Sequence, residues 1–161
     1  MRKRRKSNLY LILTLLIVVL GIASFCMMFL NVLKTGDSDS YTYYKGLDCV
    51  FGKETTVLGQ KITLKFSILG FLGFVLPLVS SVIVLVLANQ RNKLKFLISA
   101  ILFLVSAILL FIMPEYTKIY YDTFIGSGSI DRSFSLAIGS ILAGSFSSLA
   151  CLISIVAYLY K

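Results

Sequence analysis

The sequence of 161 residues contains no histidine and no tryptophan, and only 14% of its residues are charged. Histidine is the commonest general base and metal ligand in proteins, so its absence removes the usual centre of a catalytic or metal site. The chain also has neither a CxxC pair nor a phosphate-binding glycine loop. We therefore expect a protein that is not an enzyme, with no catalytic, cofactor-binding or metal-binding residues.

Four long runs carry no charge at all, at residues 9–33, 66–88, 96–113 and 133–160. A helix that crosses a bilayer needs about 20 apolar residues, with about 17 as the minimum, and every run is long enough. Since 58% of the chain is hydrophobic, the sequence predicts an all-α membrane protein, a single domain of residues 1–161 with a bundle of four transmembrane helices. Two outer loops, 34–65 and 114–132, and a short cytoplasmic link, 89–95, connect these helices.

The first run admits a second interpretation, as a cleavable signal peptide. Five basic residues precede it, and Gly21 and Ala23 resemble the small residues of a cleavage site. Its apolar stretch continues to residue 33, however, and would reach about 37 Å as a helix. That length favours a membrane span.

The excess of positive charge is confined to one side of this topology. Nine of the 16 Lys and Arg residues lie in the N-terminal tail, in the 89–95 link and at Lys161, with no acid among them. The outer loops hold the other seven together with all seven acids. Because Lys and Arg in short loops mark the cytoplasmic side, we expect both termini in the cytoplasm of a cell-membrane protein. The basic tail would then contact the anionic inner leaflet of the lipid bilayer, and no nucleic-acid partner is expected.

Small residues form a broad stripe along the fourth run, and such stripes let helices approach closely. We expect this stripe to pack within the chain, to form the seam of a homo-oligomer or of a complex with another membrane protein, or to line a polar path. Its members recur every four residues, as Ser140, Gly144 and Ser148 beside Gly139, Ala143 and Ser147.

Pro77 interrupts the second run. Proline removes one backbone donor and clashes with the carbonyl four residues earlier, so a kink near Gly73 is expected. No Asp, Glu, Lys, Arg or His lies in any of the four runs. The sequence therefore favours a kink packed against neighbouring helices over the broken helix of a transporter site.

The outer loops show strand patterns. Residues 61–66 alternate polar and apolar side chains, and we expect them to pair with residues 41–51 as a small antiparallel β-hairpin or sheet, with turns at 52–54 or 58–60. In the second loop we expect a short helical turn bearing Tyr116 and Tyr120, and then a flexible segment at 126–129. Asp131 or Ser133 is positioned to cap the fourth helix.

The three cysteines do not form an evident disulfide framework. Cys26 and Cys151 lie at different depths of the predicted bundle, and Cys49 lies in the first outer loop. A buried thiol is the expected state of Cys49, with a bridge between two chains or a free thiol as the alternatives.

The stretch from Tyr44 to Gly52, with the sequence YKGLDCVFG, resembles the first loop of small uncharacterised bacterial four-span membrane proteins. The topology as a whole resembles the claudin-type tetraspan architecture, with both ends inside and strands in the first outer loop. Claudins carry a tryptophan and two cysteines in this loop, whereas this chain has Cys49 alone. The resemblance implies a cell-membrane protein.

Three functional hypotheses follow from this composition. The first is a non-catalytic scaffold or accessory subunit that engages a partner through its outer loops and the small-residue face of the fourth helix. The alternative is a channel or small-solute permeation subunit, and the least favoured is a lipid-modifying enzyme using Asp48 or Asp122. In a channel, the path would be lined by Ser80, Ser81, Ser140, Ser147 and Ser148.

Overall fold

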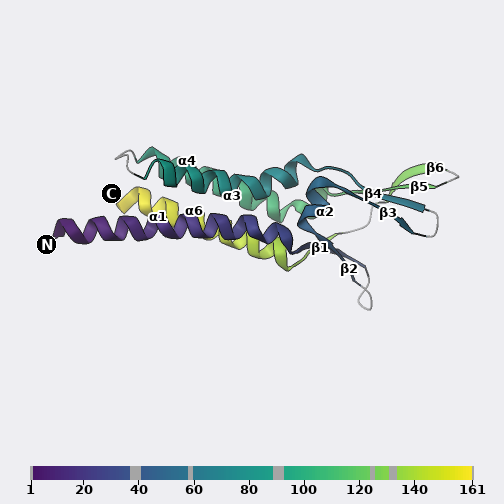
Figure 1. The fold of residues 1–161 in the computed structure, drawn as a ribbon, viewed down its shortest axis with the longest axis horizontal. Helices are drawn as coiled ribbons and strands as arrows, with labels where there is room; N and C mark the ends of the chain where they lie inside the picture. Colours follow the sequence, from purple (N-terminus) through teal and green to yellow (C-terminus); the bar gives the residue numbers. More distant parts are fainter. Residues whose placement is uncertain are drawn as a thin grey trace.

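The computed structural model describes residues 2–36, 41–57, 60–88, 93–123, 126–130 and 134–160. Its four long helices are α1 (Arg2–Cys26), α3 (Ile68–Val86), α4 (Leu94–Phe111) and α6 (Ile138–Tyr160), and each is long and apolar enough to cross a membrane. The helices run side by side, with both chain ends at one end of the bundle and the β-strands at the other (Figure 1). The predicted four-span membrane fold is confirmed.

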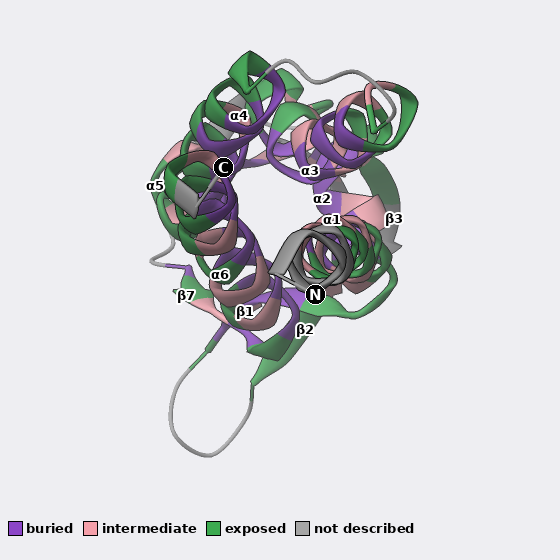
Figure 2. Cartoon of the chain, turned by 90° about the vertical axis from the view of Figure 1, so that its left-hand side faces the viewer, coloured by how far each residue is buried: buried purple, intermediate pink, exposed green. Residues whose placement is uncertain are grey.

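The four helices form a closed square. Helix α1 packs against α3 and α6, and α4 packs against the same two helices from the opposite corner. Buried residues face the centre of the square and exposed residues face outward (Figure 2). The outward surface is apolar, as lipid requires, because it carries large side chains such as Leu15, Leu85, Leu104 and Leu152.

The first and fourth predicted helices differ most from the observed helices, in both cases at the sheet end of the bundle. The first was predicted to reach residue 33, but α1 ends at Cys26 and is followed by a 3₁₀ turn, η1 (Met27–Phe29), and strand β1 (Asn31–Thr35). The hydrophobic residues at the end of this run do not face lipid. Val32 and Leu33 have no exposed surface, because they are buried in a protein core. The fourth helix begins at Ile138, beyond the proposed caps Asp131 and Ser133, which lie outside the described residues.

A three-stranded antiparallel sheet joins the first and last helices. Its strand order is β2 (Thr42–Lys45), β1 and β7 (Ser135–Leu136), with Leu33 opposite both Tyr44 and Leu136. Beyond the ladder, the N–H of Ala137 donates to the carbonyl of Val32 at 2.9 Å. The sheet therefore ties the start of α6 to the chain that leaves α1.

A four-stranded antiparallel sheet extends away from the bundle (Figure 1). Its order is β3 (Lys53–Val57), β4 (Gln60–Leu64), β5 (Ile119–Thr123) and β6 (Gly126–Ile130), so both outer loops contribute to it. The prediction of a hairpin between 61–66 and 41–51 was wrong, because β4 pairs with β3 and β5. The 46–51 segment instead forms helix α2 (Gly46–Phe51), where the lack of a side chain on Gly46 allows close contact with the backbone of Met28.

The second outer loop is more ordered than predicted. Its helical turn is present as α5 (Met113–Tyr116), which holds Tyr116, but Tyr120 belongs to strand β5. The 126–129 segment is part of β6 and not a flexible linker, because it pairs along its length with β5. A glycine–serine sequence has no pattern of its own, so its structure is set by the neighbouring strand.

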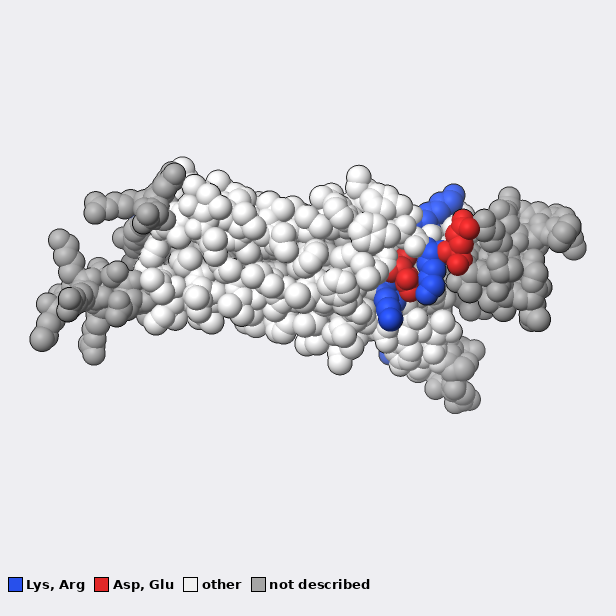
Figure 3. Space-filling model, viewed as in Figure 1, with Lys and Arg blue, Asp and Glu red and all other residues white. Residues whose placement is uncertain are grey.

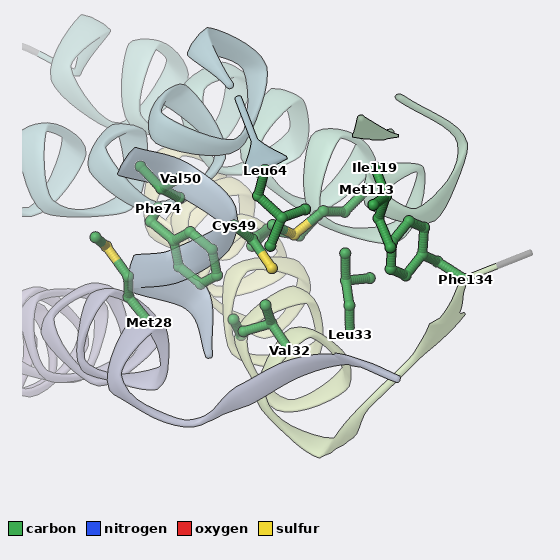
Figure 4. Close-up of a cluster of buried hydrophobic side chains, with 12 residues drawn as sticks. Met28, Val32, Leu33, Cys49, Val50, Leu64, Phe74, Met113, Ile119 and Phe134 are labelled. Carbon is green, nitrogen blue, oxygen red and sulfur yellow. The ribbon is translucent and has the colours of Figure 1, made fainter. Parts of the chain in front are cut away.

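A cluster of buried side chains joins the sheets to the bundle (Figure 4). Its members come from three long helices, α3, α4 and α6, and from the short helices η1, α2 and α5. Others come from strands β1, β4 and β5, and Phe134 directly precedes β7. The sheet end is therefore held rigidly on the helices. The members of this junction cluster are Met28, Val32, Leu33, Cys49, Val50, Leu64, Phe74, Leu110, Met113, Ile119, Phe134 and Ala143.

Candidate functional site

A layer of serine hydroxyls connects all four helices near the sheet end of the bundle. Ser24 of α1 lies 2.9 Å from the hydroxyl of Ser147 on α6, which lies 3.3 Å from the hydroxyl of Ser106 on α4. Ser106 in turn donates to the carbonyl of Gly73 on α3 at 2.7 Å. The three serines have no exposed surface. We call Ser24, Ser106, Ser147 and the Gly73 carbonyl the upper serine layer.

The hydroxyl protons of the upper serine layer are donated to backbone carbonyls and to another serine. Each hydroxyl can donate one hydrogen bond. Ser24 donates to the carbonyl of Ala143 at 3.0 Å and Ser106 donates to that of Gly73. Ser147 therefore donates its one proton to either Ser24 or Ser106, and not to both at once. Buried polar groups in a membrane interior are costly unless paired, and this arrangement pairs them.

A second layer lies closer to the chain ends. Ser80 of α3 is 2.7 Å from the hydroxyl of Ser99 on α4, and Ser99 is 3.4 Å from the hydroxyl of Ser154 on α6. Ser154 donates to the carbonyl of Ala150 at 2.7 Å. We call Ser80, Ser99 and Ser154 the lower serine layer. It joins three helices, as the upper layer joins four.

Sequence reasoning missed four serines of these layers, Ser24, Ser99, Ser106 and Ser154. A signal for three of them was present, because Ser99 and Ser106 are seven residues apart, as are Ser147 and Ser154. Residues seven apart lie two turns along the same helix face, so a polar residue repeated at this spacing faces one neighbour at two depths.

The five serines proposed for a permeation path make different contacts in the structure. Ser81 and Ser148 donate to carbonyls of their own helices, at Pro77 (2.9 Å) and Gly144 (2.8 Å). Ser140 donates to the carbonyl of Val32 at 2.6 Å, in the sheet junction. The remaining two belong to different serine layers.

The small-residue face of α6 is occupied inside the chain. Ser140, Ala143 and Ser147 have no exposed surface, and a side chain added at Gly144 would lie 2.7 Å from the ring of Phe111 on α4. Of the alternatives for this stripe, the structure shows packing within the chain. Within the chain, α1 and α4 pack against α6, and binding of a partner through this face stays a prediction.

A buried lysine lies at the opposite end of the bundle. Lys95 was assigned to the 89–95 link, but α4 begins at Leu94 and leaves Lys95 only 1% exposed. Its ammonium donates to the carbonyl of Leu87, and to that of Ala88 at 3.2 Å, where α3 ends. It also lies over the ring of Tyr10 on α1, 5.3 Å from the centroid. A cation at a helix C-terminus is favourable, so Lys95 ties α4 to α3 and α1.

Asp48 and Cys49 are neighbours in α2 but lie in different surroundings, the first in a surface ion pair and the second buried. Asp48, a candidate for a lipid-modifying enzyme, forms a surface ion pair with Lys53 at 3.0 Å. Burial, and then the charge of Asp48, raises the pKa of the Cys49 thiol to about 12, which opposes formation of a nucleophilic thiolate. The side chain of Asp122, the other candidate, lies outside the described residues. Within the described parts of the chain, no three His, Cys, Asp or Glu residues gather closely enough to hold a metal ion.

The four-stranded sheet projects from the end of the bundle (Figure 1). Its outermost strands, β3 and β6, each pair with one neighbour, and no further strand joins them among the described residues. Such edges present backbone N–H and C=O groups that can pair with another chain. The sheet is anchored where Leu64 and Ile119, opposite each other in the ladder, enter the junction cluster. Comparisons of the chain with models of protein families, with curated proteins and with solved structures found no match.

Proposed function

We propose that this multi-pass membrane protein is a non-catalytic scaffold or accessory subunit that holds its four-stranded sheet as a docking surface for an extended segment of another membrane protein. The observation that carries this proposal is the shape of the sheet: it combines both outer loops, projects from the bundle and ends in the edge strands β3 and β6. Extended segments bind such edges through backbone hydrogen bonds.

Two further features support a scaffold. The junction cluster attaches the sheets to the helices through many buried contacts, which favours a fixed presentation over a flexible one. Ser24 and Ser106 use their hydroxyl protons for bonds to a neighbouring helix, which favours an interior with a packing role.

The sheets are proposed to lie outside the cell, with both chain ends and the α3–α4 link in the cytoplasm. The support is the excess of Lys and Arg in the tails and link. In a variant whose native cysteines are replaced by alanine, a membrane-impermeant maleimide should label Ser127→Cys in intact cells. It should label Asn92→Cys only after permeabilisation. The reverse pattern would contradict this orientation.

The docking proposal is tested by photo-cross-linking in native membranes. A benzophenone side chain at Ser127 of β6 or Thr55 of β3 should give a discrete adduct, whereas the same group at Leu104, on the lipid face of α4, should not.

Gly128→Pro and Ser129→Pro supply the matched controls for an edge interaction. Successive residues of an antiparallel edge strand point their N–H groups alternately toward the neighbouring strand and away from it. One of the two variants therefore removes an outward N–H while leaving the β5–β6 ladder in place, and that variant should lose the adduct while melting normally. Adducts that survive both substitutions, or that form equally at Leu104, would contradict docking at this edge.

A further inference from the structure

Three phenylalanines form an exposed cluster beside the start of α3. The ring centroids of Phe51 and Phe71 lie 6.1 Å apart, and those of Phe66 and Phe71 lie 6.3 Å apart. Phe51, the last residue of α2, is 54% exposed, and Phe66, which precedes α3, is 56% exposed. We call these three residues the aromatic patch. Rings this large and this exposed need an apolar partner.

The aromatic patch is continuous with the lipid-facing surface of the bundle. Phe71 lies within the span of α3, and its helix neighbours Ile68, Leu69 and Leu72 are all exposed. Since Phe51 contacts a residue of a membrane span, its ring lies at the depth of that span's first turns.

The backbone fixes Phe51 at this depth. The N–H of Ser67 donates to the carbonyl of Val50 at 2.9 Å, which holds the end of α2 against the start of α3. Gly70 of α3 lies beside Val50, since a Cβ at this glycine would be in ordinary van der Waals contact with the Val50 side chain at 3.5 Å. Helix α2 cannot carry Phe51 away from the bundle without breaking these contacts.

Charged groups mark where the apolar surface ends. Asp48 and Lys53 form their ion pair on either side of Phe51 in the sequence, and Lys65, next to Phe66, lies over the ring of Tyr120 at 3.9 Å. The charges visible in Figure 3 form a band at the sheet end of the bundle. Phenylalanines flanked by Lys and Tyr at the end of a span are the pattern of a headgroup boundary.

We infer that the aromatic patch is a lipid-binding edge, in which Phe51 and Phe66 enter the headgroup region of the leaflet on the sheet side and fix how deeply the bundle sits. The occupant is lipid because the patch continues the lipid-facing surface of α3 without a break. This inference is independent of what docks on the four-stranded sheet.

The absence of tryptophan makes the test direct, because one introduced tryptophan is the only source of its fluorescence. Phe51→Trp and Phe66→Trp are reconstituted in phosphatidylcholine vesicles that contain lipid brominated either near the headgroup or near the chain end. We expect blue-shifted emission that is quenched more strongly by the shallow bromines. Leu104→Trp, on the lipid face of α4, should be quenched more strongly by the deep bromines.

Tyr43→Trp is the matched control, because Tyr43 is also 54% exposed but lies on strand β2. It should emit as a tryptophan in water and resist quenching. The inference is overturned if Phe51→Trp and Phe66→Trp behave like Tyr43→Trp. It is also overturned if their emission is blue-shifted but unaffected by bromine, which would mean that protein, such as a second copy of the chain, covers the patch.

Discussion

Ser106 donates a hydrogen bond of 2.7 Å to the carbonyl of Gly73, the carbonyl that Pro77 leaves without its helical donor. In an α-helix the carbonyl of residue 73 would accept from the N–H of residue 77, and proline has none. A side chain of α4 thus replaces the missing backbone bond of α3, and α3 continues through Pro77 to Val86.

Ser106→Ala should destabilise the bundle by about 1 kcal/mol, because it leaves the buried Gly73 carbonyl unpaired. In a Pro77→Ala background the backbone N–H of residue 77 is restored and the same substitution should cost little. Unfolding in mixed detergent and SDS micelles measures all four members of this double-mutant cycle. Ser145→Ala is the control, since Ser145 donates to a carbonyl of its own helix at the surface. Equal costs of Ser106→Ala in both backgrounds would show that the bond does not compensate for proline.

Gly21 and Gly73 should respond differently to alanine. A Cβ at Gly21 would lie 2.7 Å from the carbonyl oxygen of Pro77, a backbone atom that cannot move aside, and would collide with Ser81. A Cβ at Gly73 would meet the end of the Leu110 side chain at 3.3 Å, which can adjust. We expect Gly21→Ala to cost about 2 kcal/mol or more by forcing α1 away from α3, and Gly73→Ala to cost less than about 1 kcal/mol. Similar unfolding midpoints for the two variants would contradict this contact.

Lys95→Met should destabilise the end of the bundle that carries the termini, by about 1–2 kcal/mol. The substitution removes the ammonium from the carbonyls of Leu87 and Ala88 and from the ring of Tyr10. Lys93→Met is the control, because Lys93 is exposed. Hydrogen exchange at the end of α3 should speed up in the first variant and stay unchanged in the second. Equal behaviour of the two variants would mean that Lys95 acts as a surface charge.

Cys49 should react with a maleimide only as fast as the protein opens. It is 1% exposed in the junction cluster, whereas Cys26 is exposed. In solubilised protein, mass spectrometry should find Cys26 modified first and Cys49 only under unfolding conditions. Rapid modification of Cys49 in native buffer would contradict its burial.

The same thiol should make the protein sensitive to alkali. Folding raises the pKa of Cys49 from 9.0 to about 12, chiefly by burial. Below pH 9 the thiol is protonated in both states, but between about pH 9 and about 12 the unfolded state loses its proton first, so stability falls as pH rises. Burial also raises the pKa of Tyr116, in the same direction. Thermal melts of Cys49→Ala with Tyr116→Phe should show a flatter dependence across this range, and an unchanged slope would contradict the assignment.

The helices could be predicted from the sequence and the strand pairing could not. Hydrophobicity summed over a run indicates a membrane span without knowledge of the rest of the chain, which is why α3 and α4 begin and end close to their predicted limits. A strand pattern, in contrast, does not indicate which other strand it pairs with. Residues 61–64 were recognised as a strand, but their partners lie in β3 and in β5, the latter beyond two membrane spans.

The features of the candidate site also differ in whether the sequence predicts them. The packing of small residues on α6 followed from their spacing. The serine layers could not be predicted from the sequence. Which hydroxyl or carbonyl a buried serine contacts depends on which helices lie beside it. Lys95 is the clearest example of a residue whose role the sequence does not reveal. A lysine at the start of a span is expected at the surface, but in the structure the end of α3 lies against it.

The sequence by itself determined that the chain crosses a membrane four times, because transfer of an apolar side chain into lipid depends on that residue and its near neighbours. The tertiary structure alone decided which strands pair, which serine satisfies the Gly73 carbonyl and which aromatic side chains face lipid at the sheet end. Those outcomes depend on groups that are far apart in the chain, and a hydrogen bond or a ring contact forms only when folding brings both partners within a few ångströms.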